Sequence, residues 1–181
     1  MSYIKNEKKI LAEIRTVLEK NPEKSEKDLV KEIIKAKRVF ITGGGRSGLI
    51  GKSFAMRLMQ AGKKVFVVGE TITPSIKKND LLIVISGSGT TKTILDIVLS
   101  AKETDSFVAC LTSERNSPIA KISDLVVVLK AKTKTKGKSI QPLGSLFEQS
   151  SFIFLEAVIL GLVKKLNISE NKMRKKHASL E

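Results

Sequence analysis

The sequence has very few residues of the kinds that bind metals or form disulfide bonds. Among its 181 residues there is one cysteine, Cys110, and one histidine, His177. A single cysteine excludes an internal disulfide, and a Cys/His zinc site needs more ligands than these two residues supply. We therefore expect no metal site of this type. Catalysis would depend on carboxylates, hydroxyls, lysines and arginines, with His177 as the single imidazole.

Aromatic and acidic residues are also scarce. The chain has no tryptophan, one tyrosine and seven phenylalanines, and 33 Lys and Arg stand against 18 Asp and Glu, a formal net charge of +15. Such a charge favours anionic partners, either phosphorylated metabolites or nucleic acids. Nucleic-acid binding usually also needs aromatic side chains among the basic residues, on which bases can stack. We therefore expect small anionic ligands and no nucleic acid.

The sequence contains no uninterrupted apolar run of membrane-spanning length. The longest apolar stretch, FIFLEAVILGLV at 152–163, is interrupted by Glu156. The N-terminus, MSYIKNEKKI, carries charges where a signal peptide needs an apolar segment. With 41% hydrophobic and 28% charged residues, the composition is typical of one soluble globular domain. We expect a cytoplasmic protein with no membrane partner.

Hydrophobic periodicity predicts an α/β fold. Segments 4–20 and 25–37 have apolar residues at helical spacings of three and four. Beyond them, five short apolar runs alternate with helical segments, and strands that are apolar at nearly every position are covered on both faces of a parallel sheet. We expect a three-layer, doubly wound, five-stranded sheet in the flavodoxin-like order 2-1-3-4-5. The five runs are RVFIT (38–42), KVFVV (64–68), LLIVI (81–85), FVACLT (107–112) and DLVVVL (124–129).

A single domain, 1–181, accounts for the whole chain. Its expected parts are N-terminal helices (1–37), the sheet with its crossover helices (38–130), a basic loop (131–144), and a long helix followed by a charged tail (145–181). The lysines of 130–138 suit a solvated loop that at most attracts anions, and no site residue is expected there. Cys110 lies inside an apolar run and is expected to be a small buried hydrophobe.

Two glycine-rich loops follow the first and third predicted strands. They are GGGRSG at 43–48 and SGSGTT at 86–91. In the order 2-1-3-4-5 these two strands are neighbours whose helices leave on opposite faces, which creates the crevice where such sheets bind ligands. The two loops are therefore predicted to face each other across one pocket.

The second loop has the composition of an anion site. Gly87 and Gly89 allow the backbone to approach a ligand, while the hydroxyls around them add short donors at the start of a helix. A plain strand-to-helix turn capped by Thr90 or Thr91 is the alternative, but it would explain only one hydroxyl. We favour a phosphate site, with hydroxyls from Ser86, Ser88, Thr90 and Thr91.

Two nucleotide-binding motifs come close to matching. Gly43, Gly45 and Gly48 fit G-x-G-x-x-G, and Glu70 follows the second strand, as in dinucleotide-binding folds. A hydroxyl-rich loop across the crevice suits a compact phosphate better than a dinucleotide. Separately, GLIGKS resembles the end of a P-loop, but a P-loop requires glycine where Arg46 stands. We therefore expect neither a dinucleotide nor nucleotide hydrolysis.

The sequence resembles the sugar isomerase (SIS) fold and, within it, the 6-phospho-3-hexuloisomerases of the ribulose monophosphate pathway. The similar segments run in order from about residue 38 to the C-terminus; they are GGGRSGLIGKSFAMRLMQAG, VVGETITP, DLLIVISGSGTTKT, SIQPLGSLFEQ and KKHASLE. The resemblance implies an isomerase that converts 3-hexulose 6-phosphate to fructose 6-phosphate through an enediol, without metal or cofactor. It also implies a homo-oligomer, typically a homotetramer, with sites near subunit contacts.

The resemblance also implies roles for particular residues. Glu148 would be the catalytic base, and His177 would handle protons at the substrate oxygens from a tail docked, for example, on a neighbouring subunit. For each role the residues alone allow a plainer alternative: Glu148 as part of a capping box with Ser145, His177 in an idle exposed tail, and Arg46 on the surface. The implied substrate-binding residues are Gly45, Arg46, Ser47, Ser86, Gly87, Ser88, Thr90 and Thr91.

Other functions fit the same segments. An aldose-ketose phosphosugar isomerase would share the SGSGTT loop and differ only in substrate. A phosphosugar-binding regulatory module without catalysis would use the same fold, although the first 37 residues are too short and plain for a helix-turn-helix domain with its own core.

Overall fold

The five predicted strands form one parallel sheet in the order β2-β1-β3-β4-β5, as expected. The computed structural model describes residues 3–21 and 23–179, so the first two and last two residues of the predicted terminal segments lie outside the described residues. Each strand coincides with one of the apolar runs to within one residue at either end. The strands are β1 (Val39–Gly43), β2 (Val65–Val67), β3 (Leu81–Ile85), β4 (Phe107–Thr112) and β5 (Leu125–Val128).

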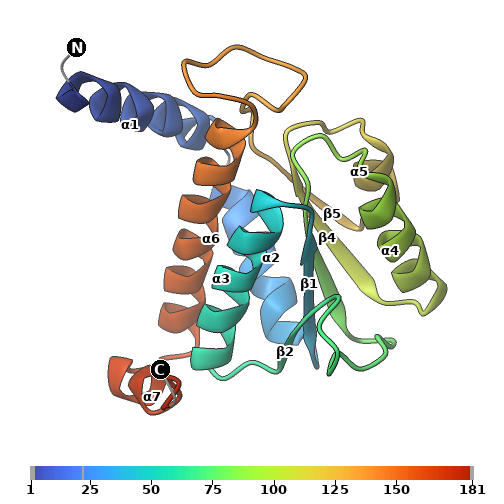
Figure 1. Cartoon of the computed structure of the whole chain (residues 1–181). Helices are drawn as coiled ribbons and strands as arrows, with labels where there is room; N and C mark the ends of the chain where they lie inside the picture. Colours follow the sequence, from blue (N-terminus) through green and yellow to red (C-terminus); the bar gives the residue numbers. More distant parts are fainter. Residues whose placement is uncertain (1–2, 22, 180–181) are drawn as a thin grey trace.

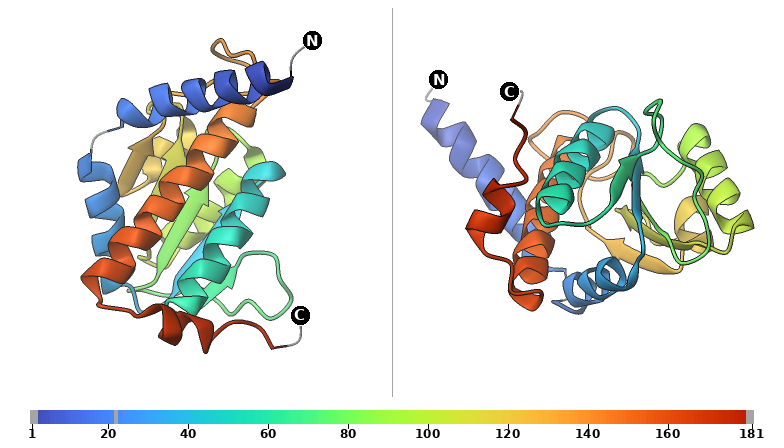
Figure 2. Two further views of the ribbon diagram at one scale, coloured as in Figure 1. Left: turned by 90° about the vertical axis from the view of Figure 1, so that its left-hand side faces the viewer. Right: turned by 90° about the horizontal axis from the view of Figure 1, so that it is seen from below.

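Helices cover both faces of the sheet and complete the predicted three layers (Figure 1). One face carries α2 (Glu23–Lys35), α3 (Arg46–Gln60) and α6 (Ser145–Lys165). The other face carries α4 (Lys92–Glu103) and α5 (Pro118–Ile122). The first helix, α1 (Tyr3–Glu19), crosses the end of α6 at which that helix begins (Figure 2).

The alternation of side chains along the strands divides the core into two clusters. Val39 and Ile41 point toward α2, α3 and α6, whereas Phe40 lies in the cluster under α4 and α5. Cys110 belongs to this second cluster and is 1% exposed, which confirms the expected small buried hydrophobe. Its burial raises the pKa of the Cys110 thiol to about 12, so the thiol remains protonated and unreactive in the folded protein.

The long helix α6 is the central helix of its layer. It occupies the range predicted from the sequence and is apolar around most of its circumference. By length and composition alone α6 could cross a membrane, but 56% of its most apolar window is buried inside the protein. It packs against α1, α2 and α3, and residues such as Val158 and Leu162 are completely buried. This is the environment of a core helix.

The tail that follows α6 was predicted only as a charged segment. It contains a short helix, α7 (Glu170–Arg174), whose N-cap Ser169 accepts a hydrogen bond from the Lys172 amide. The tail lies at the end of the molecule where α3 and α6 finish (Figure 2). There the side chain of Lys176 lies over Gly62, directly after α3.

Candidate functional site

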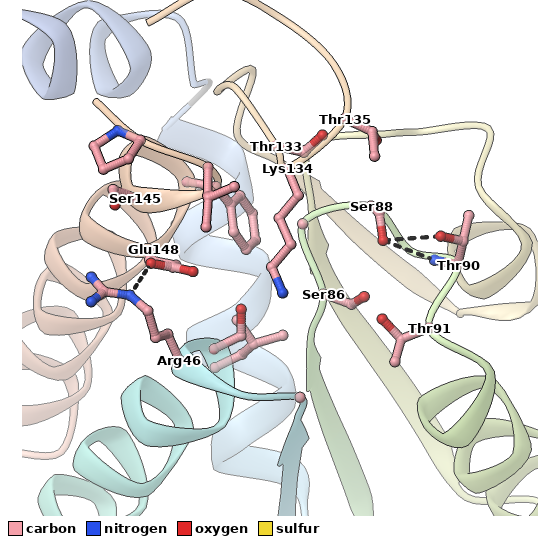
Figure 3. A pocket seen from close by; sticks show the side chains of 18 residues that line it. Arg46, Ser86, Ser88, Thr90, Thr91, Thr133, Lys134, Thr135, Ser145 and Glu148 are labelled. Carbon is pink, nitrogen blue, oxygen red and sulfur yellow. Dashed lines mark hydrogen bonds and ion pairs between the residues drawn. The ribbon is translucent and has the colours of Figure 1, made fainter. Parts of the chain in front are cut away.

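The two glycine-rich loops leave the sheet side by side. β1 and β3 are adjacent and in register, so that Gly43 at the end of β1 is paired with Ile85 at the end of β3. The loops that follow line one cavity of about 440 Å³ at the carboxyl edge of the sheet (Figure 3). The predicted proximity of the two loops is therefore confirmed.

Three helices begin at this cavity without a side-chain cap. Their N-cap residues are Gly45 for α3, Thr91 for α4 and Gly144 for α6, and none of them makes a side-chain capping hydrogen bond. In contrast, the N-caps of α5 and α7, which start elsewhere, are serines that do accept such a bond. Because the first amides of a helix have no partner within the helix and carry its positive dipole end, the cavity is strongly suited to an anion.

The loop 86–91 is held in a fixed shape by its glycines. Gly89 has a φ of 61°, and a Cβ there would overlap the side chain of Ser117, so only glycine fits. The carbonyl of Gly87 accepts hydrogen bonds from the Ser113 amide and the Thr112 hydroxyl. These contacts fix the backbone so that the hydroxyl side chains of the loop line the cavity.

Within this loop, Thr90 and Thr91 act differently from a simple cap. The Thr90 hydroxyl donates to the Ser88 hydroxyl over 3.0 Å (Figure 3). Thr91 is the N-cap residue of α4, but its side chain makes no capping bond and lines the cavity. Thr91 thus occupies the N-cap position of the alternative interpretation, but neither threonine side chain caps α4.

Glu148 stands on the opposite wall of the cavity, in the first turn of α6. Its carboxylate forms an ion pair with the guanidinium of Arg46 from the start of α3 (Figure 3). The Glu148 side chain is 8% exposed and that of Arg46 is 65% exposed. A carboxylate with little contact with water and one cationic neighbour, facing an anion cavity, can act as a base toward a bound substrate.

The capping-box alternative for Glu148 is wrong. In a capping box Ser145 would be the N-cap and the glutamate would bind its amide, but the N-cap is Gly144. The Ser145 amide donates instead to the carbonyl of Pro142 over 3.1 Å. The Glu148 carboxylate is therefore available at the cavity rather than used to close the helix end.

Most of the predicted site residues meet in this cavity. Gly45 lies at its edge, between two lining residues, with a φ of 55° as the N-cap of α3. His177 is not brought to the cavity of its own chain: it is exposed, and its Nδ1 lies 3.2 Å from the Ala178 carbonyl oxygen. The predicted residues that line the cavity are Arg46, Ser47, Ser86, Gly87, Ser88, Thr90, Thr91 and Glu148.

Sequence reasoning missed the contribution of the basic loop 131–144. No site residue was predicted among the lysines of 130–138, but one of them, Lys134, lines the cavity. Its amino group points into the cavity between Glu148 on one wall and Ser86 and Thr91 on the other (Figure 3). The further lining residues that were not predicted are Gly44, Ile85, Thr133, Thr135, Pro142, Leu143, Gly144, Ser145 and Phe147.

The residues that suggested nucleotide binding pair with each other instead. Lys52, from the P-loop-like segment, donates to Glu70 over 2.7 Å, and both side chains are about half exposed. Within residues 3–21 and 23–179, no three His, Cys, Asp or Glu side chains cluster as metal ligands. The ionisable groups that line the cavity are Arg46, Lys134 and Glu148.

Comparison with known proteins assigns the chain to a family. A model of the SIS domain matches residues 32–155, which include both glycine-rich loops and Glu148. The chain belongs to the SIS domain family. The SIS domain thus extends over the sheet, the loops and part of α6.

Individual relatives agree with this assignment. The 3-hexulose-6-phosphate isomerase of Methanocaldococcus jannaschii is 44% identical over 152 residues, covering 84% of this SIS protein and 82% of the relative. The enzyme of the same name from Bacillus subtilis is 42% identical over 157 residues, with 84% and 85% covered. These similarities confirm the predicted resemblance to the 6-phospho-3-hexuloisomerases.

Solved structures confirm the fold. A Methanococcus jannaschii protein, for which 3-hexulose-6-phosphate isomerase activity was inferred, superposes with a TM-score of 0.87 at 38% identity, covering 98% of this chain and 99% of its own. A more distant protein from Escherichia coli superposes with a TM-score of 0.80 at 23% identity, with 98% and 100% covered. At that identity the likeness concerns the fold alone.

Proposed function

We propose that this SIS protein is a 3-hexulose-6-phosphate isomerase, which converts its substrate to fructose 6-phosphate through an enediol. The observation that carries the proposal is the buried Glu148 carboxylate facing a cavity at which α3, α4 and α6 all begin uncapped. The relatives with 42% and 44% identity that bear this enzyme's name supply the substrate class.

The phosphoryl group would bind at the start of α4. There the loop 86–91 offers main-chain amides and the hydroxyls of Ser86, Ser88 and Thr91, with Ser47 from the neighbouring loop. Such a site needs no metal, since amides and hydroxyls of a helix N-terminus are sufficient donors for a phosphate. Anchored in this way, the sugar chain would extend across the cavity toward α6.

Glu148, on the opposite wall of the cavity, would carry out the proton transfer. Moving the carbonyl from C3 to C2 requires removal of the proton on C2, a C2–C3 enediol in which O3 gains a proton and O2 gives one up, and delivery of a proton to C3. Glu148 would take the first proton and return one to the same face of the enediol. Arg46, which already pairs with Glu148, would stabilise the negative charge that develops on the substrate oxygens.

Assembly of subunits would complete the site. α1, α3 and α6 leave an apolar groove that is also lined by Arg46 and Glu148, so a subunit packed there would border the catalytic residues. The proposal therefore includes a soluble cytoplasmic homotetramer, in which His177 reaches the substrate of a neighbouring subunit. Within one chain the distance is too long, because the tail lies beyond the far end of α3, whose 15 residues span about 22 Å.

The direct test of this function is conversion of 3-hexulose 6-phosphate to fructose 6-phosphate in deuterated water with a chelator present. We expect product formation, and deuterium at C3 of the product wherever the transferred proton exchanges with solvent. Failure to convert this substrate, together with turnover of an aldose phosphate from a panel, would identify an aldose-ketose isomerase instead. Binding of phosphosugars without any turnover would indicate a regulatory module.

The role of Glu148 is tested by Glu148→Gln. This change preserves size and removes the base, so we expect turnover to fall by about a hundredfold or more. The melting temperature is measured alongside as a control on folding. Near-normal turnover with a lower melting temperature would show that Glu148 only supports the structure.

A further inference from the structure

Lys134 is a cation at the cavity that the sequence and the family resemblance left without a role. It lines the cavity, and its amino group points inward from the basic loop (Figure 3). Neighbouring lysines of the loop are engaged elsewhere: Lys136 forms an ion pair with Glu114 over 3.2 Å, and Lys132 donates to the carbonyl of Gln141. Among the described residues, Lys134 has no carboxylate within ion-pair distance.

The position of this loop is fixed by α1. The carboxylate of Glu13 accepts hydrogen bonds from the Ser139 hydroxyl at 2.7 Å, the Ile140 amide at 3.0 Å and the Gln141 side-chain amide at 3.2 Å. The loop also closes on itself, since the amide of Thr133 donates to the carbonyl of Lys136 over 2.9 Å. Lys134 lies inside this closed turn and is therefore held over the cavity, rather than carried by a freely moving chain.

Of the two cationic side chains that line the cavity, one has no carboxylate partner in the described part of the chain and can pair with an anionic ligand. The positive charge of Arg46 is compensated by Glu148, whereas that of Lys134 is not compensated by any lining residue. A sugar phosphate brings nearly two negative charges at neutral pH, and the hydroxyls of the loop 86–91 are neutral donors. A phosphate bound beside Ser86 and Thr91 would therefore lack a cationic partner on its own side of the cavity unless Lys134 supplied it.

From this arrangement we infer that Lys134 is a substrate-binding residue that pairs with the phosphoryl group, with Glu13 as the residue that positions its loop. The inference rests on the proposed function, because it takes a phosphosugar as the ligand. It assigns a role to the basic loop, which becomes part of the binding site rather than a general attractor of anions. Binding of the substrate would depend on this one lysine among the several in the loop.

The experiment is calorimetric titration of the protein with fructose 6-phosphate and with inorganic phosphate. We expect Lys134→Ala to weaken both by about tenfold or more, in line with the loss of a charge-assisted hydrogen bond. Lys134→Arg keeps the charge and should retain most of the affinity. The matched control is Lys138→Ala, an exposed lysine of the same loop that does not line the cavity and loses the same charge.

The possible results separate the inference from the proposed function. If the unaltered protein binds both anions and Lys134→Ala binds them within about twofold of it, the inference is wrong, and equal weakening by Lys138→Ala would also overturn it. Binding of fructose 6-phosphate without turnover of 3-hexulose 6-phosphate would refute the proposed function while the Lys134 comparison still stands. Absence of binding to the unaltered protein would refute both.

Discussion

At the scale of single residues, Glu148 and Arg46 form an ion pair whose partners differ greatly in exposure. The carboxylate is 8% exposed, whereas the guanidinium is 65% exposed. The arginine can therefore reorient toward a ligand without disturbing the core, while the carboxylate stays fixed by the packing of α6. This division of mobility suits a base that must stay in place and a cation that follows charge as it develops.

A glycine beside this pair provides a test of how tightly the cavity wall is built. A Cβ at Gly87 would lie 2.9 Å from Cδ1 of Phe147, the buried residue before Glu148. We expect Gly87→Ala to displace the ring and to destabilise the protein by about 1–3 kcal/mol. It should also lower turnover, because the ring belongs to the residue next to Glu148, the proposed base. Urea denaturation and steady-state kinetics measure the two effects.

Gly44→Ala is the matched control for this change. Gly44 also lines the cavity, but a Cβ there would meet only Cγ2 of Thr91 at 3.8 Å, an ordinary contact. Its unfolding free energy should remain close to that of the unaltered protein. Equal unfolding free energies of Gly87→Ala and Gly44→Ala would show that the Phe147 ring can move aside at little cost and does not constrain the site.

The loop 86–91 could be predicted as part of the site from its residue types, whereas Lys134 could not. Glycines and hydroxyls crowded after β3 indicate an anion site on their own, because few other functions require them there. Lys134 could not be identified in this way, since it is one of several lysines in a loop without periodicity. The loop that carries it is bound to Glu13 through residues 126 to 128 positions away from that glutamate, which no local pattern records.

At the scale of elements, α1 acts as a support for the loop over the cavity. Burial acts to raise the pKa of Glu13, but hydrogen bonds from Ser139, Ile140 and Gln141 and the charge of Lys132 outweigh it and hold that pKa below its usual value. A lowered pKa in the folded state means that the ionised carboxylate stabilises the fold. This stabilisation is present above the unfolded pKa and is lost as the pH falls through the folded one.

We expect Glu13→Gln at pH 7 to lower the melting temperature slightly and to weaken binding of fructose 6-phosphate, because the loop is held less firmly. As the pH falls through the lowered pKa of Glu13, the unaltered protein protonates this carboxylate and the two melting temperatures should converge. Glu7→Gln, an exposed change on the same helix, is the control. A difference in melting temperature that persists unchanged once Glu13 is protonated would contradict the proposed support.

Helices and strands could be predicted from the sequence where apolar residues occupy nearly every position. All five strands and α6 follow from apolar runs, because burial on both sides leaves no polar positions to obscure the boundaries. The capping box at Ser145 was misleading, because Gly144 precedes it as N-cap and the Pro142 carbonyl occupies the Ser145 amide. Helix α7 was not foreseen, since its five residues, ENKMR, carry no apolar stripe.

At the level of the whole molecule, apolar side chains remain exposed around Arg46 and Glu148. An apolar groove between α1, α3 and α6 is lined by Ile10, Ile50 and Phe152 as well as by Arg46 and Glu148. Leu11, Leu49 and Leu160 on the same three helices are each more than 60% exposed. Apolar surface of this kind is typical of subunit contacts.

We expect Phe152→Glu to reduce the size of the assembly. Phe152 is 42% exposed and lies on the groove, so a carboxylate there would be buried by an approaching subunit without a partner. Leu99→Glu on α4, where the side chain is 47% exposed on the opposite layer, is the control. Analytical ultracentrifugation measures both. Dissociation by the Leu99 change alone would place the contact on the α4 face.

The role of His177 between subunits can be tested by mixing inactive variants. Glu148→Gln and His177→Asn should each be nearly inactive as pure proteins. If each site combines Glu148 of one subunit with His177 of another, re-assembled mixtures should recover about a quarter of the normal activity. Each active site in the mixture would take its intact Glu148 from a His177→Asn subunit and its intact His177 from a Glu148→Gln subunit. Absence of recovery, or full activity of His177→Asn alone, would rule out the shared site.

We propose that the cavity holds a phosphosugar with its phosphoryl group at the start of α4 and its carbonyl end at Glu148. A crystal structure with bound fructose 6-phosphate would test this placement. We predict phosphate oxygens within hydrogen-bond distance of the 86–91 loop and Lys134, and C2 and C3 of the sugar beside the Glu148 carboxylate. A phosphate bound elsewhere, or a sugar whose C2 and C3 lie away from Glu148, would rule out this binding mode.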